Sequence, residues 1–256
     1  MVKMLTQNHI LAFKVKKMKQ YLIAGLKTEY AVRGELLGTR SEKYSAEFDS
    51  TEADIRIELS DEFLKMKQAK YPHLTPDEHE YMWTGEAFYN KLLKFDGMML
   101  HSSCVEKDGY AYLFSARSGT GKSTHTHLWL ENLSGTRIIN DDKPALVYEN
   151  GAWYAWGTPF SGKTDENVNI KLPVRAIIFL HRSEENKVEK IPAAKSVGLL
   201  IEQTVKPMQR EMAMKMLDMA DLLLRSVPVF SLGCNMDPQA AVVAYNEIER
   251  LIKDEN

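Results

Sequence analysis

The sequence predicts an α/β protein, and three observations lead to this fold class. The apolar run 110–114 is followed directly by a glycine-rich stretch and then by a helical pattern, which gives the order strand, loop, helix. The nearly continuous apolar run 174–180 is typical of a strand that is covered on both faces. Most of the chain after residue 193 has helical periodicity. Together these patterns predict a sheet with helices packed against it.

The composition is that of an ordinary globular protein. The chain has 256 residues, of which 44% are hydrophobic, and its formal net charge is −2. We expect a small N-terminal β/α region, 1–95, packed on a larger domain, 96–256. The small charge argues against nucleic acid or an anionic membrane as a partner, and no apolar run approaches the roughly 20 residues that span a bilayer. Cys104 and Cys234 lack metal-type spacing, so we expect reduced thiols in a soluble, cytoplasmic protein.

The N-terminal part is predicted to contain short strands and one well-defined helix. Alternating or apolar runs indicate strands within 20–33 and 51–59, with an irregular polar segment between them. A helix begins after Thr75, because threonine can cap it, a proline follows at the first helical position and Glu78 completes a capping box. We expect this helix to run to about Lys94.

Two hairpins are predicted in the middle of the chain. Asp108-Gly109 and Asn150-Gly151 are tight-turn signals, and each lies between two short apolar runs. The elements predicted here are strands 98–105 and 110–116, a helix 122–133, a strand 136–139, and strands 144–148 and 152–156. Beyond the strand 174–180 we expect helices 193–204, 207–225 and 237–253 and a strand 228–232. The methionines of the helix 207–225 are expected to fill the core.

The most informative motif is the stretch 115–124, which reads SARSGTGKST. The pattern G-x-x-x-x-G-K-[ST] is met at Gly121, Lys122 and Ser123, while Ala116 stands at its first position. Between a strand and a helix, such a loop wraps phosphates with backbone N–H groups, and the helix N-terminus adds its positive end. We expect ATP or GTP to bind here, through Ser118, Gly119, Thr120, Gly121, Lys122, Ser123 and Thr124.

We expect one lysine, one serine and two aspartates to bind the phosphates and the metal ion and to assist phosphate transfer at this loop. Lys122 would reach the outer phosphates, and the Ser123 hydroxyl would ligate Mg²⁺. Asp141 and Asp142 come 19 and 20 residues after Lys122, a spacing that one helix and one return strand would fill. One carboxylate could bind Mg²⁺ while the other takes a proton from an attacking hydroxyl. The alternative is a solvated Asn-Asp-Asp turn.

Three histidines and a second lysine complete the candidates. His101 lies in the strand that precedes the loop strand, where it could assist the base or be structural. His125 and His127 are two residues apart on a helix and face different sides, so we expect packing or surface roles. In the loop GTPFSGKT at 157–164, Lys163 could add a positive charge at the transferring phosphoryl group, or it is an exposed side chain.

Four of these stretches together resemble a known family. LHSSCV, SGTGKST, NDDKPAL and GTPFSGKT, in this order and spacing, resemble the HPr kinase/phosphorylase-related proteins, distant relatives of phosphoenolpyruvate carboxykinase that share its phosphate-loop fold. The resemblance is best over 96–182, and it implies a mixed sheet with flanking helices. It also implies that Asp142 deprotonates an acceptor serine, with Asp141 beside the metal and His101 supporting Asp142. Ala116 departs from the family pattern.

The expected function is that of an ATP-dependent kinase that transfers the γ-phosphate to a hydroxyl, and the expected acceptor is a serine of a protein or peptide. ATP and Mg²⁺ are the expected cofactors, and the expected catalytic residues are Asp142, Lys122, His101 and Lys163. Two alternatives stay open: a nucleotide-binding regulatory module with little or no transfer activity, and a kinase of a free small molecule. The identity of the phosphoacceptor and the oligomeric state also stay open.

Overall fold

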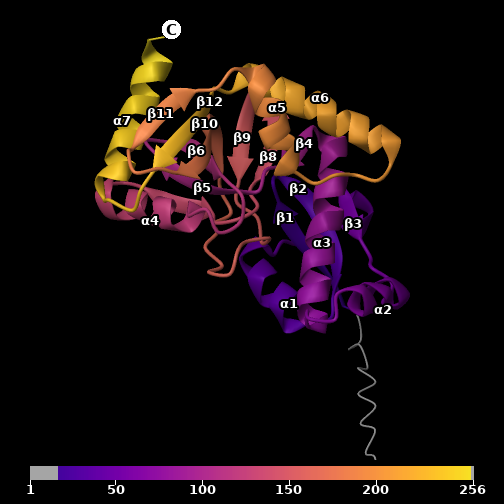
Figure 1. The fold of residues 1–256 in the computed structure, drawn as a ribbon. Helices are drawn as coiled ribbons and strands as arrows, with labels where there is room; N and C mark the ends of the chain where they lie inside the picture. Colours follow the sequence, from indigo (N-terminus) through magenta and orange to yellow (C-terminus); the bar gives the residue numbers. More distant parts are fainter. Residues whose placement is uncertain (1–16, 255–256) are drawn as a thin grey trace, which may run out of the picture.

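The computed structural model describes residues 17–254 and consists of a curled mixed sheet with flanking helices and a smaller N-terminal part (Figure 1). The strands are β1 (Lys17–Ile23), β2 (Leu26–Val32), β3 (Ile55–Ile57), β4 (Gly97–Met99), β5 (Ser102–Lys107), β6 (Tyr110–Ser115), β7 (Arg137–Asn140), β8 (Ala145–Glu149), β9 (Ala152–Trp156), β10 (Lys171–Arg182), β11 (Lys187–Lys190) and β12 (Val229–Cys234). The helices are α1 (Glu35–Ser41), α2 (Asp61–Lys70), α3 (Pro76–Leu92), α4 (Lys122–Asn132), α5 (Ala193–Glu202), α6 (Arg210–Ser226) and α7 (Gln239–Lys253), with short 3-10 helices η1 (Glu42–Tyr44), η2 (Ser50–Glu52) and η3 (Leu93–Phe95). Within these residues, every helix is too short or too polar to cross a membrane.

The large sheet has two arms that meet at β10. Its strands follow the order β4-β8-β9-β10-β6-β5-β7, and β12 lies between β10 and β11. The first residues of β10, Lys171 to Pro173, pair antiparallel with β9. From Val174 onward β10 pairs parallel with β6, and from Ile177 onward also with β12. One long strand therefore belongs to both arms, and the sheet curls where β10 passes from one arm to the other.

The ends of several strands meet at one edge of the sheet. The strand β5 lies between β6 and β7 and is antiparallel to both. Ser102 at the start of β5 lies opposite Ser115 at the end of β6, and Cys104 lies opposite Asn140 at the end of β7. Because β10 is parallel to β6, the ends of β6, β7 and β10 reach the same edge. The glycine-rich stretch leaves β6 at this edge.

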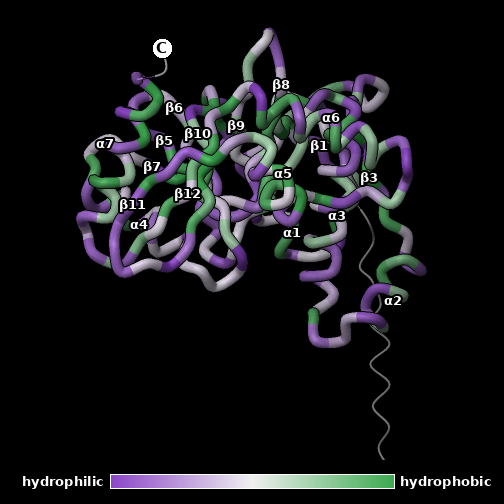
Figure 2. The backbone as a smooth tube through the Cα atoms, turned by 45° about the horizontal axis from the view of Figure 1, so that its top comes forward, coloured by the Kyte–Doolittle hydropathy of each residue, from purple (hydrophilic) through white to green (hydrophobic). Residues whose placement is uncertain are grey.

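Alternate residues of the central strands enter two hydrophobic cores, as the two-residue period of a strand requires. Ile177 and Phe179 pack with α5 and α6, whereas Ala176 and Ile178 pack with α4 and α7 on the other face (Figure 1). The hydrophobic residues gather on these strands, whereas the surrounding loops are largely hydrophilic (Figure 2). Residues 176–180 are all buried, which confirms the prediction of a strand covered on both faces.

The N-terminal part packs on the arm of the sheet that contains β4 and β8. Its own small sheet has the order β1-β2-β3. Tyr21 and Tyr30 from this sheet and Phe88 from α3 form a third core together with Val147 of β8 and Phe160. Residues 1–16 of the predicted N-terminal region lie outside the described residues.

Several predicted elements are confirmed. The helix α3 begins after Thr75, whose hydroxyl accepts a hydrogen bond from the Glu78 N–H at 3.2 Å, while the Glu78 carboxylate accepts one from the Thr75 N–H at 2.7 Å. Both hairpins form, and their turns hold Asp108 and Asn150 in the left-handed region, each followed by a glycine there. The helices α4 to α7 lie within about three residues of their predicted bounds, and Met216 and Met219 of α6 are in the core as expected.

Other predictions were wrong, for identifiable reasons. The run 98–105 is not one strand, because β4 pairs with β8 in one arm and β5 pairs with β6 in the other, and the chain crosses between the arms at Leu100. The strand at 51–59 is reduced to β3, preceded by η2. The segment 39–50, expected to be irregular, is helical at its start, because α1 runs to Ser41 and η1 follows it. The short helix α2 and the charged strand β11 gave no periodic signal; β11 forms through its pairing with β12 and buries only Val188.

The capping box at the start of α3 gives a stability prediction. Thr75→Ala removes the hydroxyl that satisfies an N–H group of the first helical turn, so the free energy of unfolding should fall by about 1 kcal/mol. Urea unfolding followed by circular dichroism measures this change. Thr75→Ser keeps the hydroxyl and serves as the matched control. An alanine variant as stable as the serine variant would show that the box contributes nothing.

Candidate functional site

The glycine-rich loop leaves β6 after Ser115 and enters α4 at Lys122. Gly119 and Gly121 have φ angles of 77° and 126°, a region that side chains other than glycine rarely adopt. A Cβ atom at either position would meet nothing within 4 Å, so the backbone angle rather than crowding requires glycine there. Thr120 closes the loop, because its N–H and its hydroxyl donate to the Arg117 carbonyl at 3.2 and 2.8 Å.

The loop ends at the N-terminus of α4, where backbone N–H groups are available. The first N–H groups of any helix have no partner within it. In α4 the earliest internal bond runs from the His125 N–H to the Gly121 carbonyl at 2.9 Å. Ser123 and Thr124 are exposed at this end. The positive end of the helix and these N–H groups together suit an anion.

Lys122 folds back over the loop. Its ammonium donates a hydrogen bond to the Ala116 carbonyl at 3.0 Å. Burial lowers the pKa of Lys122, and the negative charge of Asp142 opposes that shift without cancelling it. The Lys122 ammonium is therefore close enough to Asp142 for the two charges to interact.

His101 and Asp142 form a hydrogen-bonded pair beside this loop. The distance from His101 Nε2 to Asp142 Oδ1 is 2.9 Å. The other ring nitrogen of His101 lies 2.9 Å from the Gln203 amide oxygen, and the His101 N–H donates to the Gln203 carbonyl at 2.7 Å. The Ser115 hydroxyl at the start of the loop donates to the His101 carbonyl at 2.8 Å. The ring is thus fixed between Gln203 and the carboxylate.

Asp142 is held in its ionised form. Burial by itself would raise its pKa, but the hydrogen bond from His101 and the adjacent charge and hydrogen bond of Lys143 outweigh burial. Together they hold the pKa of Asp142 well below the usual range of a carboxyl group. The Lys143 ammonium binds the second oxygen, Oδ2. Both carboxylate oxygens are therefore occupied.

Asn140 fixes the turn that carries both aspartates. Its side-chain oxygen accepts hydrogen bonds from the N–H groups of Asp142 at 3.0 Å and Lys143 at 2.6 Å. Its amide nitrogen donates to the Thr158 carbonyl at 3.0 Å. Asp141 is 7% exposed, so this turn is not the solvated one that the alternative interpretation describes.

Asp141 links the loop 157–164 to the turn that carries both aspartates, through two hydrogen bonds. One of its oxygens accepts a hydrogen bond from the Gly162 N–H at 2.6 Å, and the other accepts one from the Thr164 hydroxyl. Lys163 lies between these two partners and is exposed. Across the described part of the chain we find no hydrogen bond or ion pair of its side chain. Its predicted catalytic role stays a prediction.

The two histidines of α4 have separate surroundings. His125 is buried against Phe114, accepts a hydrogen bond from the Trp129 indole at 3.1 Å, and has a pKa that burial lowers to about 4. This is the packing role that the sequence predicts. His127 contacts the Ser123 carbonyl at 2.7 Å and lies 3.4 Å from the carboxylate of Glu166.

Glu166 and Arg182 are residues of the site that sequence reasoning missed. One oxygen of Glu166 is buried and has no hydrogen-bond partner among residues 17–254, and the Glu166 carbonyl accepts the Asp141 N–H at 3.0 Å. Arg182 donates to the carbonyls of Gly119 and Thr120 at 2.7 and 3.3 Å. The sequence does contain a signal for Arg182. This residue follows the apolar run of β10, and the carboxyl ends of parallel strands meet at the same edge of a sheet, where ligands bind. The sequence around Glu166 contains no comparable signal.

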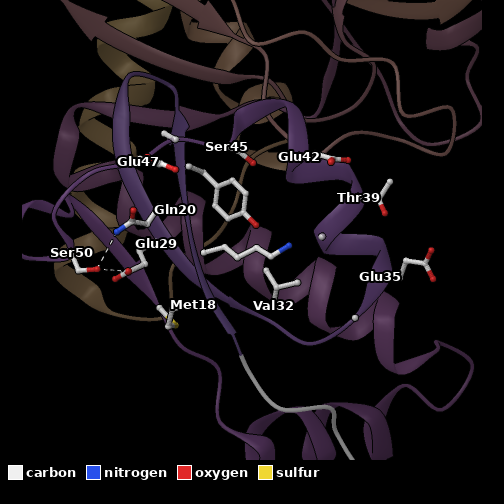
Figure 3. A pocket seen from close by; sticks show the side chains of 15 residues that line it. Met18, Gln20, Glu29, Val32, Glu35, Thr39, Glu42, Ser45, Glu47 and Ser50 are labelled. Carbon is white, nitrogen blue, oxygen red and sulfur yellow. Dashed lines mark hydrogen bonds between the residues drawn. The ribbon is translucent and has the colours of Figure 1, made fainter.

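One hollow borders the glycine-rich loop, and another lies in the N-terminal part, away from the predicted site residues. A cavity of about 530 Å³ borders the glycine-rich loop and is lined by Ala116, Arg117, Ser118, Gly119, Thr120, Phe179, Leu180, His181, Arg182, Leu199, Glu202 and Gln203. A hollow of about 1100 Å³ lies in the N-terminal part, where Figure 3 shows Gln20, Ser50 and Glu29 linked by hydrogen bonds. None of the predicted site residues lines this second hollow. Within residues 17–254, no three His, Cys, Asp or Glu side chains converge as a metal cluster.

The role of Asn140 can be tested by removing its side chain. Asn140→Ala leaves the N–H groups of Asp142 and Lys143 without their acceptor, so the free energy of unfolding should fall by about 1–3 kcal/mol. Asn169→Ala is the matched control, because Asn169 is exposed and its amide makes one bond, to the Leu22 carbonyl. Chemical denaturation measures both variants. Equal stability of the two would contradict the assignment of Asn140 as the residue that fixes the turn.

Two of the comparisons with known proteins, with solved structures and with protein families, find similarity to this chain. The solved structure of the HPr(Ser) kinase/phosphatase from Coxiella burnetii matches 61% of this chain and 94% of its own length, with 12% sequence identity and a TM-score of 0.38. A search of curated proteins finds no match. The family described as SynChlorMet cassette protein ScmC matches residues 79–253, which is more than half of the chain and includes every residue of the site described above. This chain therefore belongs to the ScmC family of SynChlorMet cassette proteins.

Proposed function

We propose that this protein is an ATP-dependent kinase that transfers the γ-phosphate to a hydroxyl, with a serine of a protein or peptide as acceptor. The observation that carries the proposal is the His101–Asp142 pair, which orients an ionised carboxylate beside the glycine-rich loop and Lys122. A loop that bound nucleotide only for regulation would not need an oriented carboxylate at this place.

Nucleotide binding is proposed at the glycine-rich loop. The free N–H groups at the start of α4 would bind the phosphates, and Lys122 would turn from the Ala116 carbonyl to the outer phosphates. The cavity of about 530 Å³ beside the loop offers room for the nucleoside. Arg182 binds the carbonyls of Gly119 and Thr120. These two carbonyls would therefore point away from bound phosphates, and backbone N–H groups would face the phosphates.

The residues present fit a magnesium ion. Mg²⁺ takes oxygen ligands, and in nucleotide sites it uses one or two carboxylates or hydroxyls together with phosphate oxygens. The Ser123 residue, whose hydroxyl is exposed, is linked to Glu166 through His127, which lies 2.7 Å from the Ser123 carbonyl and 3.4 Å from the Glu166 carboxylate. Glu166 in turn accepts the Asp141 N–H at its carbonyl, and its unpartnered carboxylate oxygen adds a third possible ligand. We propose that Ser123 and Asp141 hold the ion, with Glu166 as the further carboxylate. When bound, Mg²⁺ neutralises phosphate charge.

In the proposed reaction the acceptor oxygen attacks the γ-phosphorus. The new O–P bond forms as the bond to the bridging oxygen of ADP breaks, and the hydroxyl proton passes to the Asp142 carboxylate. A carboxylate with a lowered pKa is a weak base, but the loose transition state of phosphoryl transfer demands little proton abstraction. Asp142 therefore contributes mainly by orienting the hydroxyl, and His101 holds it in place. Lys163 is proposed to approach the phosphoryl group in the transition state.

Nucleotide binding is tested by thermal unfolding with and without ATP and Mg²⁺. A ligand at about 100 times its Kd adds about 2.7 kcal/mol to the free energy of unfolding, so Tm should rise. Lys122→Ala should abolish most of the rise without unfolding the protein, whereas Lys195→Ala, an exposed lysine of α5, should keep it. No rise for the wild-type protein at millimolar nucleotide would rule out the nucleotide site.

The two aspartates are expected to differ in role. Asp142→Asn should keep the ATP-induced rise in Tm and reduce phosphate transfer by a factor of about 10²–10⁴, because the neutral amide neither orients the acceptor hydroxyl as the carboxylate does nor accepts its proton. Asp141→Asn should instead raise the concentration of Mg²⁺ needed for half-maximal transfer. Transfer to peptide acceptors with labelled ATP provides the readout. Normal transfer by both variants would mean that the turn has no part in the chemistry.

A further inference from the structure

A further cavity, of about 550 Å³, lies between α3 and the segment that follows α5. Its volume falls within the range of about 300–1,000 Å³ found for ligand sites. The walls are mainly apolar and come from parts of the chain far apart in sequence. The lining residues that matter here are Tyr81, Met82, Tyr89, Met99, Phe160 and Val205.

This cavity is connected to the His101–Asp142 pair through Lys143. Lys143 lines it, and the Lys143 ammonium binds the Asp142 carboxylate. Gln203, which binds His101, lines the cavity of about 530 Å³ beside the glycine-rich loop. The residues that follow it, 204–206, line the cavity of about 550 Å³. The His101–Asp142 pair therefore connects Gln203, which lines one cavity, with Lys143, which lines the other.

The walls of the cavity are fixed before any ligand binds. The Thr204 hydroxyl donates to the Met99 carbonyl at 2.6 Å, which ties the segment after α5 to β4. The Tyr89 hydroxyl bonds the Lys143 carbonyl, which ties α3 to the turn that carries Asp142. At Gly85 the helix approaches Phe160 so closely that a Cβ atom would lie 2.9 Å from its ring. At the rim, Met82 remains 39% exposed.

We propose that this cavity binds the acceptor polypeptide, and that it takes a large apolar side chain next to the serine that receives the phosphate. This inference rests on the proposed kinase activity. A free serine or a small polar metabolite would leave the apolar walls uncovered, whereas a peptide places an aliphatic or aromatic side chain within a few residues of its hydroxyl. The serine hydroxyl would then lie near the Asp142 carboxylate, which Lys143 at the cavity wall binds.

The test uses mixtures of synthetic serine peptides in which one position beside the serine at a time is fixed as Leu, Met, Phe, Ala, Asp or Lys. With ATP and Mg²⁺, the wild-type protein should phosphorylate peptides with Leu, Met or Phe at one flanking position at least about tenfold faster than those with Ala or Asp, because burying such a side chain contributes at least that factor. Met82→Glu and, independently, Val205→Asp should abolish the preference. Both should keep the ATP-induced rise in Tm.

Met66→Glu is the matched control, since Met66 is 58% exposed on α2 and does not line the cavity. It should leave rate and preference unchanged. Phosphorylation of the peptides without a preference for apolar neighbours, or a preference that survives Met82→Glu and Val205→Asp, would overturn the acceptor site and leave the kinase proposal intact. Binding of ATP without phosphorylation of any peptide would overturn both.

Discussion

The register of β5 between β6 and β7 is the constraint on which the candidate site depends. Ser102 opposite Ser115 places His101 beside the start of the glycine-rich loop, and Cys104 opposite Asn140 places Asp142 beside His101. A shift of one residue in either pairing would turn every side chain to the other face and separate these groups. The buried faces of β5 and β6 oppose such a shift, because both enter the hydrophobic cores.

At this site the cost of burying the charged Asp142 carboxylate is offset by the groups that pair with it. A partly buried carboxylate is unfavourable unless it is paired, and His101 and Lys143 supply the pairing for Asp142. The same pairing lowers the pKa of Asp142, so the group is well suited to orient a hydroxyl and less suited to remove its proton. The Lys122 ammonium is bound only to the neutral Ala116 carbonyl, a partner that it could exchange for a phosphate oxygen in the proposed nucleotide complex.

Much of the fold could be predicted from local patterns. The turn residues at Asn150, the capping box at Thr75 and the glycine-rich stretch each act over a few residues, and each has the structure that was expected. The features that were missed depend on pairing over long distances. Gln203 reaches His101 across 102 positions, and the break at Leu100 arises because neighbouring segments join different arms of the sheet. No local pattern encodes either.

The most direct test of the central claim is a crystal structure with a non-hydrolysable ATP analogue and Mg²⁺. The account predicts phosphates on the N–H groups of residues 118–124, with the Lys122 ammonium moved from the Ala116 carbonyl to a phosphate oxygen. It also predicts the γ-phosphate facing Asp142. Phosphates bound elsewhere, or a Lys122 side chain that stays on the Ala116 carbonyl while the nucleotide is bound, would contradict the account.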